Sequence, residues 1–129
     1  MRRRIRRCRW PLPVSYTHLG RGCKSVRCSS SPDNDLAVGV WEDGRIGTMR
    51  GIRKGKADYG AFVLCEKVMR QVSPDSSQSI YAGLVARITK FFQTKEPPIA
   101  IDETLEICAF IQGALDSSQN HCCDVKIEL

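Results

Sequence analysis

The sequence predicts an α+β fold in which a largely antiparallel, open-faced sheet carries two helices packed on one face. Three observations predict this class. Two extended segments flank the turn-forming dipeptide Asp43-Gly44, two segments with helically spaced apolar residues follow, and the last five residues alternate apolar with polar side chains. Strands followed by helices, rather than strict alternation of the two, are typical of this class.

The length and composition indicate one globular domain. The 129 residues leave no room for a nucleotide-binding domain beside a substrate domain, and 42% hydrophobic with 26% charged residues is ordinary for a folded chain. The longest apolar stretches, such as residues 60–65, are far shorter than the roughly 18 residues of a membrane-spanning helix. We therefore expect no membrane partner.

Basic residues are concentrated at the N-terminus. Residues 1–27 contain nine Lys and Arg and no acid, whereas residues 28–129 carry eleven Lys and Arg against fourteen Asp and Glu. The segment 13–19, PVSYTHL, resembles translated adapter sequence, so residues 1–30 are interpreted as a disordered or foreign arm and residues 31–129 as the domain. Neutralisation of nucleic-acid phosphates and a mitochondrial presequence are the alternatives for the arm. The acidic body disfavours nucleic acid as a partner.

Seven cysteines without a repeating spacing disfavour a secreted disulfide framework and favour a reducing, cytoplasmic location. Cys23 and Cys28, together with the run 121–123, are a weak match to zinc ligands, because structural zinc sites usually show two regular Cys or His pairs. We therefore predict no metal site. Cys65 and Cys108 lie in apolar segments, where a thiol behaves as a small hydrophobe.

Residues 36–42 and 45–53 are predicted strands joined by a two-residue type I′ turn at Asp43-Gly44. This turn predicts that one face, assigned to the core, pairs Glu42 with Arg45, Val40 with Gly47, Val38 with Met49 and Leu36 with Gly51. The other face would hold Ala37, Gly39, Trp41, Ile46, Thr48, Arg50 and Ile52. That face is more apolar than a solvent-exposed face usually is, and it holds too many polar residues for a core covered by a helix. We therefore expect another element or another protein to pack against it.

The remaining elements follow from periodicity. Residues 60–65 are apolar on both faces, which predicts a third, central strand. Ser79 is expected to cap a helix that runs to about Gln93, and Pro97-Pro98 forbids its continuation. Asp102 is expected to cap a second helix, buried through a broad stripe formed by Leu105, Ile107, Cys108, Phe110, Ile111, Ala114 and Leu115. Residues 125–129 predict a closing strand with one wet face.

No catalytic or cofactor-binding residue can be assigned from spacing. The segment 51–56, GIRKGK, has the wrong spacing for a phosphate-binding loop, and no glycine fingerprint, Ser-His-Asp set or paired carboxylates can be argued. The basic run Arg50, Arg53, Lys54 and Lys56 is interpreted as a solvated strand end, with a phosphate or acidic-sugar contact as the alternative. Alone, this chain does not look like a complete enzyme.

Several segments from residue 38 to residue 129 resemble the C-terminal end of the Gfo/Idh/MocA oxidoreductases. The resemblance covers about 90 residues and is carried by GVWEDGRIGTMRGIRKGKADYGAFV, by the helix pattern with Tyr81, Leu84, Ile88, Phe91 and Phe92, by Pro97-Pro98, and by ETLEI at residues 103–107. It implies the C-terminal domain of an enzyme that passes hydride between NAD or NADP and a hydroxyl carbon of a sugar or cyclitol.

This chain departs from the family pattern. It lacks the Rossmann domain with its glycine fingerprint and the early helix that usually supplies an active-site Asp and His, so the resemblance implies a partial domain that binds no cofactor and is inactive alone. Glu66-Lys67 is similar to the family's Glu-Lys-Pro segment, but Val68 replaces the proline and the position in the chain differs. An exposed strand end is the simpler interpretation of Lys67.

The resemblance also implies oligomerisation, because family members often pair their open sheets. Trp41, Ile46, Thr48 and Ile52 are therefore the candidate residues for contact with another subunit, with an interior role as the alternative. The predicted function is a fragment of an NAD(P)-dependent sugar or cyclitol oxidoreductase that comprises its substrate and oligomerisation domain. The alternative is a non-catalytic α+β interaction module, with its basic arm on nucleic acid.

Overall fold

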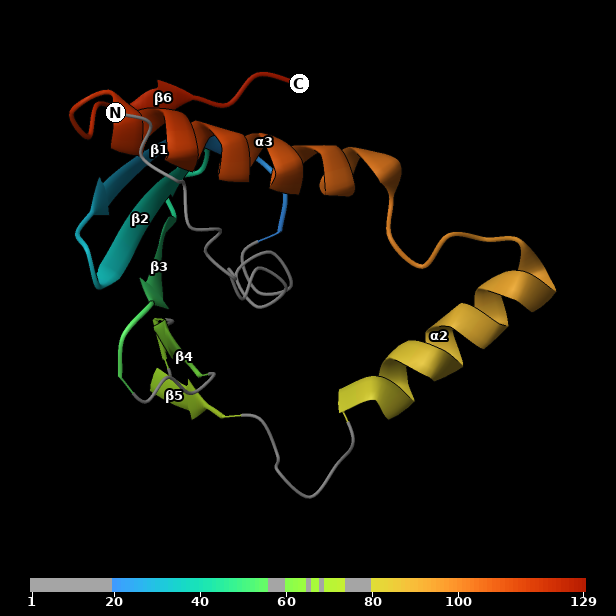
Figure 1. Cartoon of the computed structure of the whole chain (residues 1–129). Coiled ribbons are helices and arrows are strands. Elements are labelled where there is room, and N and C mark those ends of the chain that lie inside the picture. Colours follow the sequence, from blue (N-terminus) through green and yellow to red (C-terminus); the bar gives the residue numbers. More distant parts are fainter. Residues whose placement is uncertain (1–19, 56–59, 65, 68, 74–79) are drawn as a thin grey trace, which may run out of the picture. The chain divides into compact units, whose positions relative to one another are not determined.

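The computed structural model describes residues 20–55, 60–64, 66–67, 69–73 and 80–129 (Figure 1). These residues fall into two compact units. One unit comprises residues 20–55 and 102–129, and the other comprises the described residues between 60 and 101. The predicted α+β class is confirmed, because an antiparallel four-stranded sheet and a two-stranded sheet occur together with two helices.

The first unit contains the four-stranded sheet. Its strands are β1 (Cys23–Ser30), β2 (Asn34–Trp41), β3 (Ile46–Ile52) and β6 (Val125–Lys126), in the order β3-β2-β1-β6 with every neighbour antiparallel. The closing strand was predicted over residues 125–129 and is shorter, pairing with Ser25 and Val26 of β1.

Strand β1 corrects the predicted domain boundary. Residues 23–30 were assigned to the arm, yet they form an interior strand hydrogen-bonded to β2 on one side and to β6 on the other. Val26 and Cys28 are buried while Arg27 and Ser29 are exposed, which is the alternation of a strand with one covered face. Residues 1–19 of the predicted arm lie outside the described residues.

The predicted register of the β2–β3 hairpin is wrong by one residue. Val40 pairs with Ile46, Val38 with Thr48 and Leu36 with Arg50. The loop has three residues rather than two: the Gly44 N–H donates to the Trp41 carbonyl (3.0 Å), the Trp41 N–H donates to the Arg45 carbonyl (2.9 Å), and Gly44 has φ +86°. This is a type I turn followed by a left-handed glycine, which Asp43-Gly44 suits as well as it suits a type I′ turn.

The shift exchanges the two faces of β2, because neighbouring residues of a strand point to opposite faces. The covered face of the sheet, as we name it, consists of Val26, Cys28, Asp35, Ala37, Gly39, Trp41, Met49 and Gly51, all buried. Leu36, Val38 and Val40, which were predicted to face the core, lie on the opposite face.

Helix α3 (Ile101–Gln119) runs across the covered face (Figure 1). Phe110 and Ala114 complete the hydrophobic core there, and the Phe110 ring lies 6.4 Å from the Trp41 ring, centroid to centroid. Gly39 allows this close approach, since a Cβ at position 39 would lie 2.7 Å from Phe110 and 2.9 Å from Trp41. The aromatic pair therefore occupies the space that small residues of β2 leave open.

The face of α3 that packs on the sheet differs from the prediction. Its buried residues are Glu106, Phe110, Gly113, Ala114 and Ser117, whereas Leu105 and Cys108 of the predicted stripe are exposed. The helix begins at Ile101, so Asp102 lies in its first turn rather than at its cap, where it forms an ion pair with Arg21 (3.6 Å).

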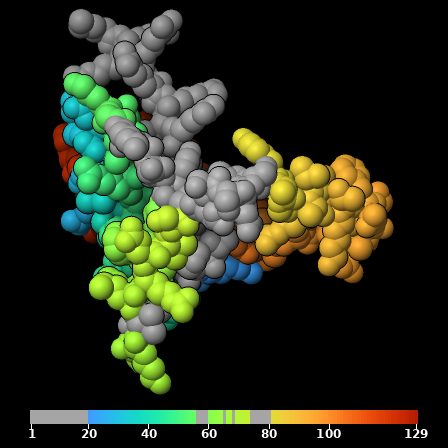
Figure 2. Space-filling model, turned by 90° about the horizontal axis from the view of Figure 1, so that it is seen from below, coloured from blue at the N-terminus to red at the C-terminus, as the bar shows by residue number. Residues whose placement is uncertain are grey.

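The second unit contains a hairpin of β4 (Ala61–Leu64) with β5 (Met69–Val72), and helix α2 (Ile80–Thr94). The segment 60–65 was predicted as a central strand; instead β4 belongs to a two-stranded sheet, and Phe62 and Leu64 are exposed. Helix α2 occurs where it was predicted, while its expected cap, Ser79, lies outside the described residues. Within the second unit, the apolar stripe of α2 is exposed (yellow to orange in Figure 2), and in the first unit α3 is the helix that packs on the sheet.

Neither helix of the described residues combines the length and the apolar character needed to cross a bilayer.

Candidate functional site

The face of the four-stranded sheet opposite α3 is the candidate site, and we name it the open face. It consists of Ser25, Arg27 and Ser29 of β1, Asn34, Leu36, Val38 and Val40 of β2, Ile46, Thr48, Arg50 and Ile52 of β3, and Lys126 of β6. Each of these side chains is exposed or half-buried.

Three of the four predicted contact residues lie on this face. Ile46, Thr48 and Ile52 share it, and Ile46 is 65% exposed. Trp41 does not: it is 2% exposed on the covered face, and its indole N–H donates to the Gly20 carbonyl (2.8 Å). The assignment of Trp41 to the contact face is therefore wrong, because it depended on the shifted register.

The open face has an apolar column bordered by charge. Leu36, Val38 and Val40 follow one another along β2, and Ile46 and Ile52 extend the apolar surface onto β3. Arg27 on the β1 side forms a two-point ion pair with Asp124 (2.6 and 2.9 Å). The Arg50 guanidinium donates to the Asn34 side chain (3.2 Å), so it leans back over β2. An aliphatic patch with a polar border is the usual composition of a protein contact surface.

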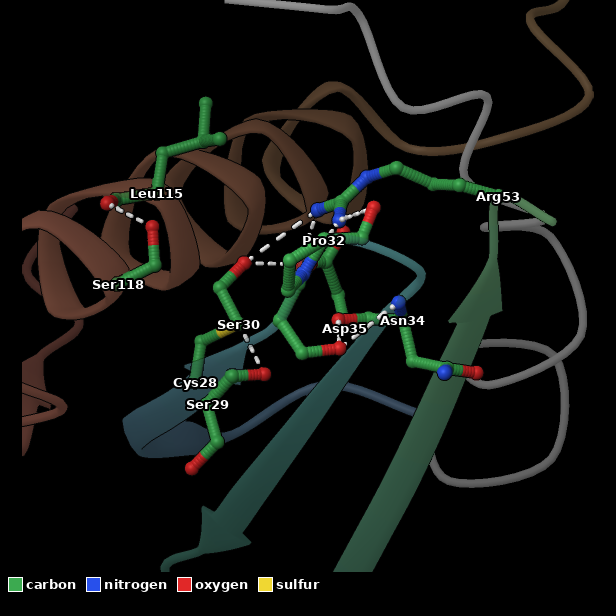
Figure 3. A network of polar contacts seen from close by, with 10 residues as sticks. Cys28, Ser29, Ser30, Pro32, Asn34, Asp35, Arg53, Leu115 and Ser118 are labelled. Atoms are coloured by element: carbon green, nitrogen blue, oxygen red, sulfur yellow. Dashed lines mark hydrogen bonds and ion pairs between the residues drawn. The ribbon is translucent and has the colours of Figure 1, made fainter.

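A polar cluster at one end of the sheet ties β1, β2 and β3 together (Figure 3). The buried Asp35 carboxylate forms an ion pair with Arg53 and accepts a hydrogen bond from the Ser30 hydroxyl. Arg53 also donates to the carbonyls of Ser31 and Pro32 in the β1–β2 turn. Every group in the cluster has a partner within the chain, which indicates a structural clasp.

A second buried carboxylate joins α3 to the start of β1. Glu106 is 3% exposed, and its carboxylate accepts hydrogen bonds from the N–H groups of Gly22 (2.9 and 3.1 Å) and Cys23 (2.8 Å). A hollow of about 490 Å³ adjoins this carboxylate, with Arg21, Glu42 and Leu129 also in its wall. Because Glu106 already holds two backbone donors, it acts first as a clamp.

Cys23, next to this clamp, is a poor nucleophile. Burial and, second, the neighbouring Glu106 carboxylate raise the pKa of its thiol to about 11. The thiolate, which is the reactive form of cysteine, is therefore scarce at neutral pH. This chemistry argues against a catalytic or redox role for Cys23.

The residues considered as weak zinc candidates, Cys28 and the run 121–123, have structural roles in the backbone. Cys28 donates its N–H to the Ser117 hydroxyl (2.9 Å), which in turn donates to the Cys123 carbonyl (2.5 Å). His121 and Cys122 have left-handed φ angles of 55° and 59° and turn the chain from α3 toward β6. Among the residues that the structure describes, no group of three or more His, Cys, Asp or Glu is placed to hold a metal ion.

The other residues considered from the sequence are dispersed. Lys67 lies between β4 and β5 with its side chain exposed. Of the basic run, Arg50 and Arg53 are bound to Asn34 and Asp35, and Lys56 lies outside the described residues.

Sequence reasoning missed Asp35 and Glu106, the two buried carboxylates. Asp35 stands just before the predicted strand over residues 36–42, and Glu106 lies within the predicted second helix. Asp35 lies two residues before Ala37 in a strand, and Glu106 lies four residues before Phe110 in a helix. These spacings put each carboxylate on the same face as its buried apolar neighbour, and this is the signal in the sequence that indicates the covered face.

Comparisons of this chain with protein-family models, with curated proteins and with solved structures found no match.

Proposed function

We propose that this chain is the C-terminal substrate and oligomerisation part of an NAD(P)-dependent oxidoreductase acting on a sugar or cyclitol, and that a second subunit packs on its open face. The observation that carries the proposal is the apolar column on the open face, where Leu36 and Val40 are exposed and Val38 is half-buried, on a sheet whose other face is covered by α3.

Two features support the oxidoreductase part. Residues 38–129 resemble the end of that family, and the fold class is the one that the resemblance implies, an antiparallel sheet open on one side. Fold likeness alone does not identify a reaction, so the activity of the parent depends on the resemblance. In the proposed parent enzyme, the described residues would supply packing and subunit-contact surfaces. Hydride transfer would require a nucleotide-binding domain in addition.

The contact surface is tested by sedimentation of the full chain and of Leu36→Asp. Leu36 is 45% exposed in the middle of the open face, between Ser29 and Arg50. A carboxylate at this position would be desolvated in a subunit contact, so we expect weaker association. Leu129→Asp is the matched control, because Leu129 is 71% exposed and does not belong to the open face. Equal association of both variants and wild type contradicts the proposal.

The parent enzyme is tested by the transcript upstream of the codon for Gly20. A reading frame that encodes a strand, a glycine fingerprint and a helix supports an oxidoreductase parent. An untranslated region at that place would instead favour the interaction module without chemistry.

A further inference from the structure

We propose that β3 pairs edge to edge with β3 of a second copy of this chain, antiparallel and centred on Met49, so that two four-stranded sheets form one continuous sheet. This interface is distinct from the open face and does not depend on the oxidoreductase proposal.

The first argument is the edge itself. β3 is the outermost strand of its sheet, and no strand of the described residues pairs with its outer side. Natural proteins protect such edges with prolines, bulges or several charges. The strand IGTMRGI has no proline, its pairing with β2 is regular, and it carries one charge, Arg50, which leans toward Asn34 of β2.

The second argument is which backbone groups point outward. The Trp41 N–H donates to the Arg45 carbonyl and the Arg53 N–H donates to the Asp33 carbonyl, so the odd-numbered residues of β3 direct their backbone groups to β2. The even-numbered residues therefore direct theirs to the free edge: Ile46, Thr48, Arg50 and Ile52.

The third argument is that the strand is nearly the same read in either direction. With Met49 on a two-fold axis, Ile46 lies opposite Ile52 of the second copy, Thr48 opposite Arg50, and Gly47 opposite Gly51. Residues 46, 48, 50 and 52 then form the hydrogen-bonded pairs, which is the set whose N–H and C=O groups are available. Any pairing of even-numbered with odd-numbered residues would leave those groups without partners.

The side chains fit the same arrangement. Each Ile46–Ile52 pair is an apolar contact on the open face, where these residues are 65% and 39% exposed in one chain. Thr48 opposite Arg50 places no like charges face to face. The two Met49 side chains meet in a non-hydrogen-bonded pair, where opposite residues are closest, and methionine fills irregular space well.

The first test removes one outward donor. Thr48→Pro deletes an N–H that makes no bond to β2, and proline is tolerated on a strand at such an outward position. Two N–H···O bonds are lost per dimer, so we expect the dissociation constant in sedimentation equilibrium to rise roughly 30-fold. Thr48→Ala removes the same hydroxyl and methyl groups but keeps the N–H, so the difference in dissociation constant between Thr48→Pro and Thr48→Ala measures the lost N–H. Circular dichroism of each variant confirms that the sheet is intact.

The outcomes separate the two interfaces. Loss of association with Thr48→Pro but not with Leu36→Asp supports the edge and contradicts the open-face proposal, and the reverse result overturns the edge. A folded wild-type chain that stays monomeric throughout the micromolar range, or a folded Thr48→Pro that associates like wild type, also overturns the edge.

The second test fixes the register. Full-length Ile46→Cys and Ile52→Cys chains are mixed and oxidised, and the crosslinked peptides are identified by mass spectrometry. Positions 46 and 52 of different chains would have Cα atoms about 5.5 Å apart, within disulfide range. We expect crosslinks between positions 46 and 52 in the mixture and none between two copies of position 46 in Ile46→Cys alone. A dominant 46–46 crosslink would overturn the antiparallel register.

Discussion

The two faces of the four-stranded sheet differ in a way that overall hydrophobicity does not reveal. The covered face contributes small residues from β2, such as Ala37 and Gly39, and its volume is filled by Trp41 and by Phe110 of α3. The open face carries the larger number of branched aliphatic side chains, and α3 does not cover them.

This contrast shows that the face of a strand with the most aliphatic side chains need not be the face that a helix of the same chain covers. One aromatic pair buries more area than several valines, provided that small residues leave space for it. The aliphatic residues of the open face then require another explanation, and contact with a second copy is the explanation that we propose. Substitutions on each face test this difference.

Trp41→Ala should have the largest effect. It removes the ring that fills the covered face and leaves a cavity beside Phe110, so the free energy of unfolding should fall by about 3–5 kcal/mol. Urea denaturation of the first unit measures this loss. A loss below about 1 kcal/mol would show that the covered face is not the principal core.

Glu106→Ala should be the next most destabilising change. It leaves the buried N–H of Cys23 and the N–H of Gly22 without their acceptor, at a cost of about 2–4 kcal/mol in unfolding free energy. Thermal unfolding measures the loss, and faster hydrogen exchange at the Cys23 amide locates it. Glu106→Gln keeps one acceptor oxygen and should lose less, so equal losses in the two variants would contradict the clamp.

Cys23 should make the stability of the covered face depend on alkaline pH. The pKa of the thiol is about 11 in the folded chain against 9.0 for an ordinary thiol. The contribution of the neutral thiol to the free energy of unfolding is therefore complete below pH 9 and is lost as the pH rises toward 11. Unfolding free energies measured at both ends of this range should fall less for Cys23→Ala than for wild type. Identical pH profiles would contradict burial as the cause of the raised pKa.

Ile46→Thr should have the smallest effect on the stability of a single chain. The side chain is 65% exposed and threonine keeps the β-branch, so unfolding free energy at dilute concentration should change by less than about 0.5 kcal/mol. Association at higher concentration should weaken, because the apolar pair with Ile52 of a second copy is lost. A large loss of stability in the dilute chain would mean that Ile46 is covered by its own chain.

Much of the fold follows from local patterns. The helix spacing of Leu84, Ile88 and Phe91 predicts α2, and the segments flanking Asp43-Gly44 predict the β2–β3 hairpin. The register does not follow, because Asp-Gly suits two-residue and three-residue loops, and a difference of one residue exchanges the faces of β2. That single ambiguity moved Trp41 from the core to the predicted contact surface.

The other errors have a different physical origin. Strand β1 was missed because the basic residues around it dominated the interpretation of the N-terminus, although Val26 and Cys28 alternate with polar residues. The roles of Glu106 and Asp35 depend on contacts between distant segments; Glu106 bonds to residues 83 and 84 positions away. Strand and helix periodicity indicates that both carboxylates face the core, but it does not identify the distant residues that they contact. Of the candidate site, Ile46, Thr48 and Ile52 were identified on one face, because alternation within β3 does not depend on the loop.

The clamp at Glu106 has a consequence for the order of events during synthesis. The β1–β2–β3 meander leaves the ribosome long before α3 and β6, and its covered face, with Trp41 and the Gly22 and Cys23 amides, stays bare until those last residues emerge. A nascent chain stalled before residue 101 therefore presents an uncovered aromatic surface, the kind of substrate that molecular chaperones hold. Emergence of α3 and β6, rather than collapse of the meander, is then the step that covers this surface and lowers the risk of aggregation.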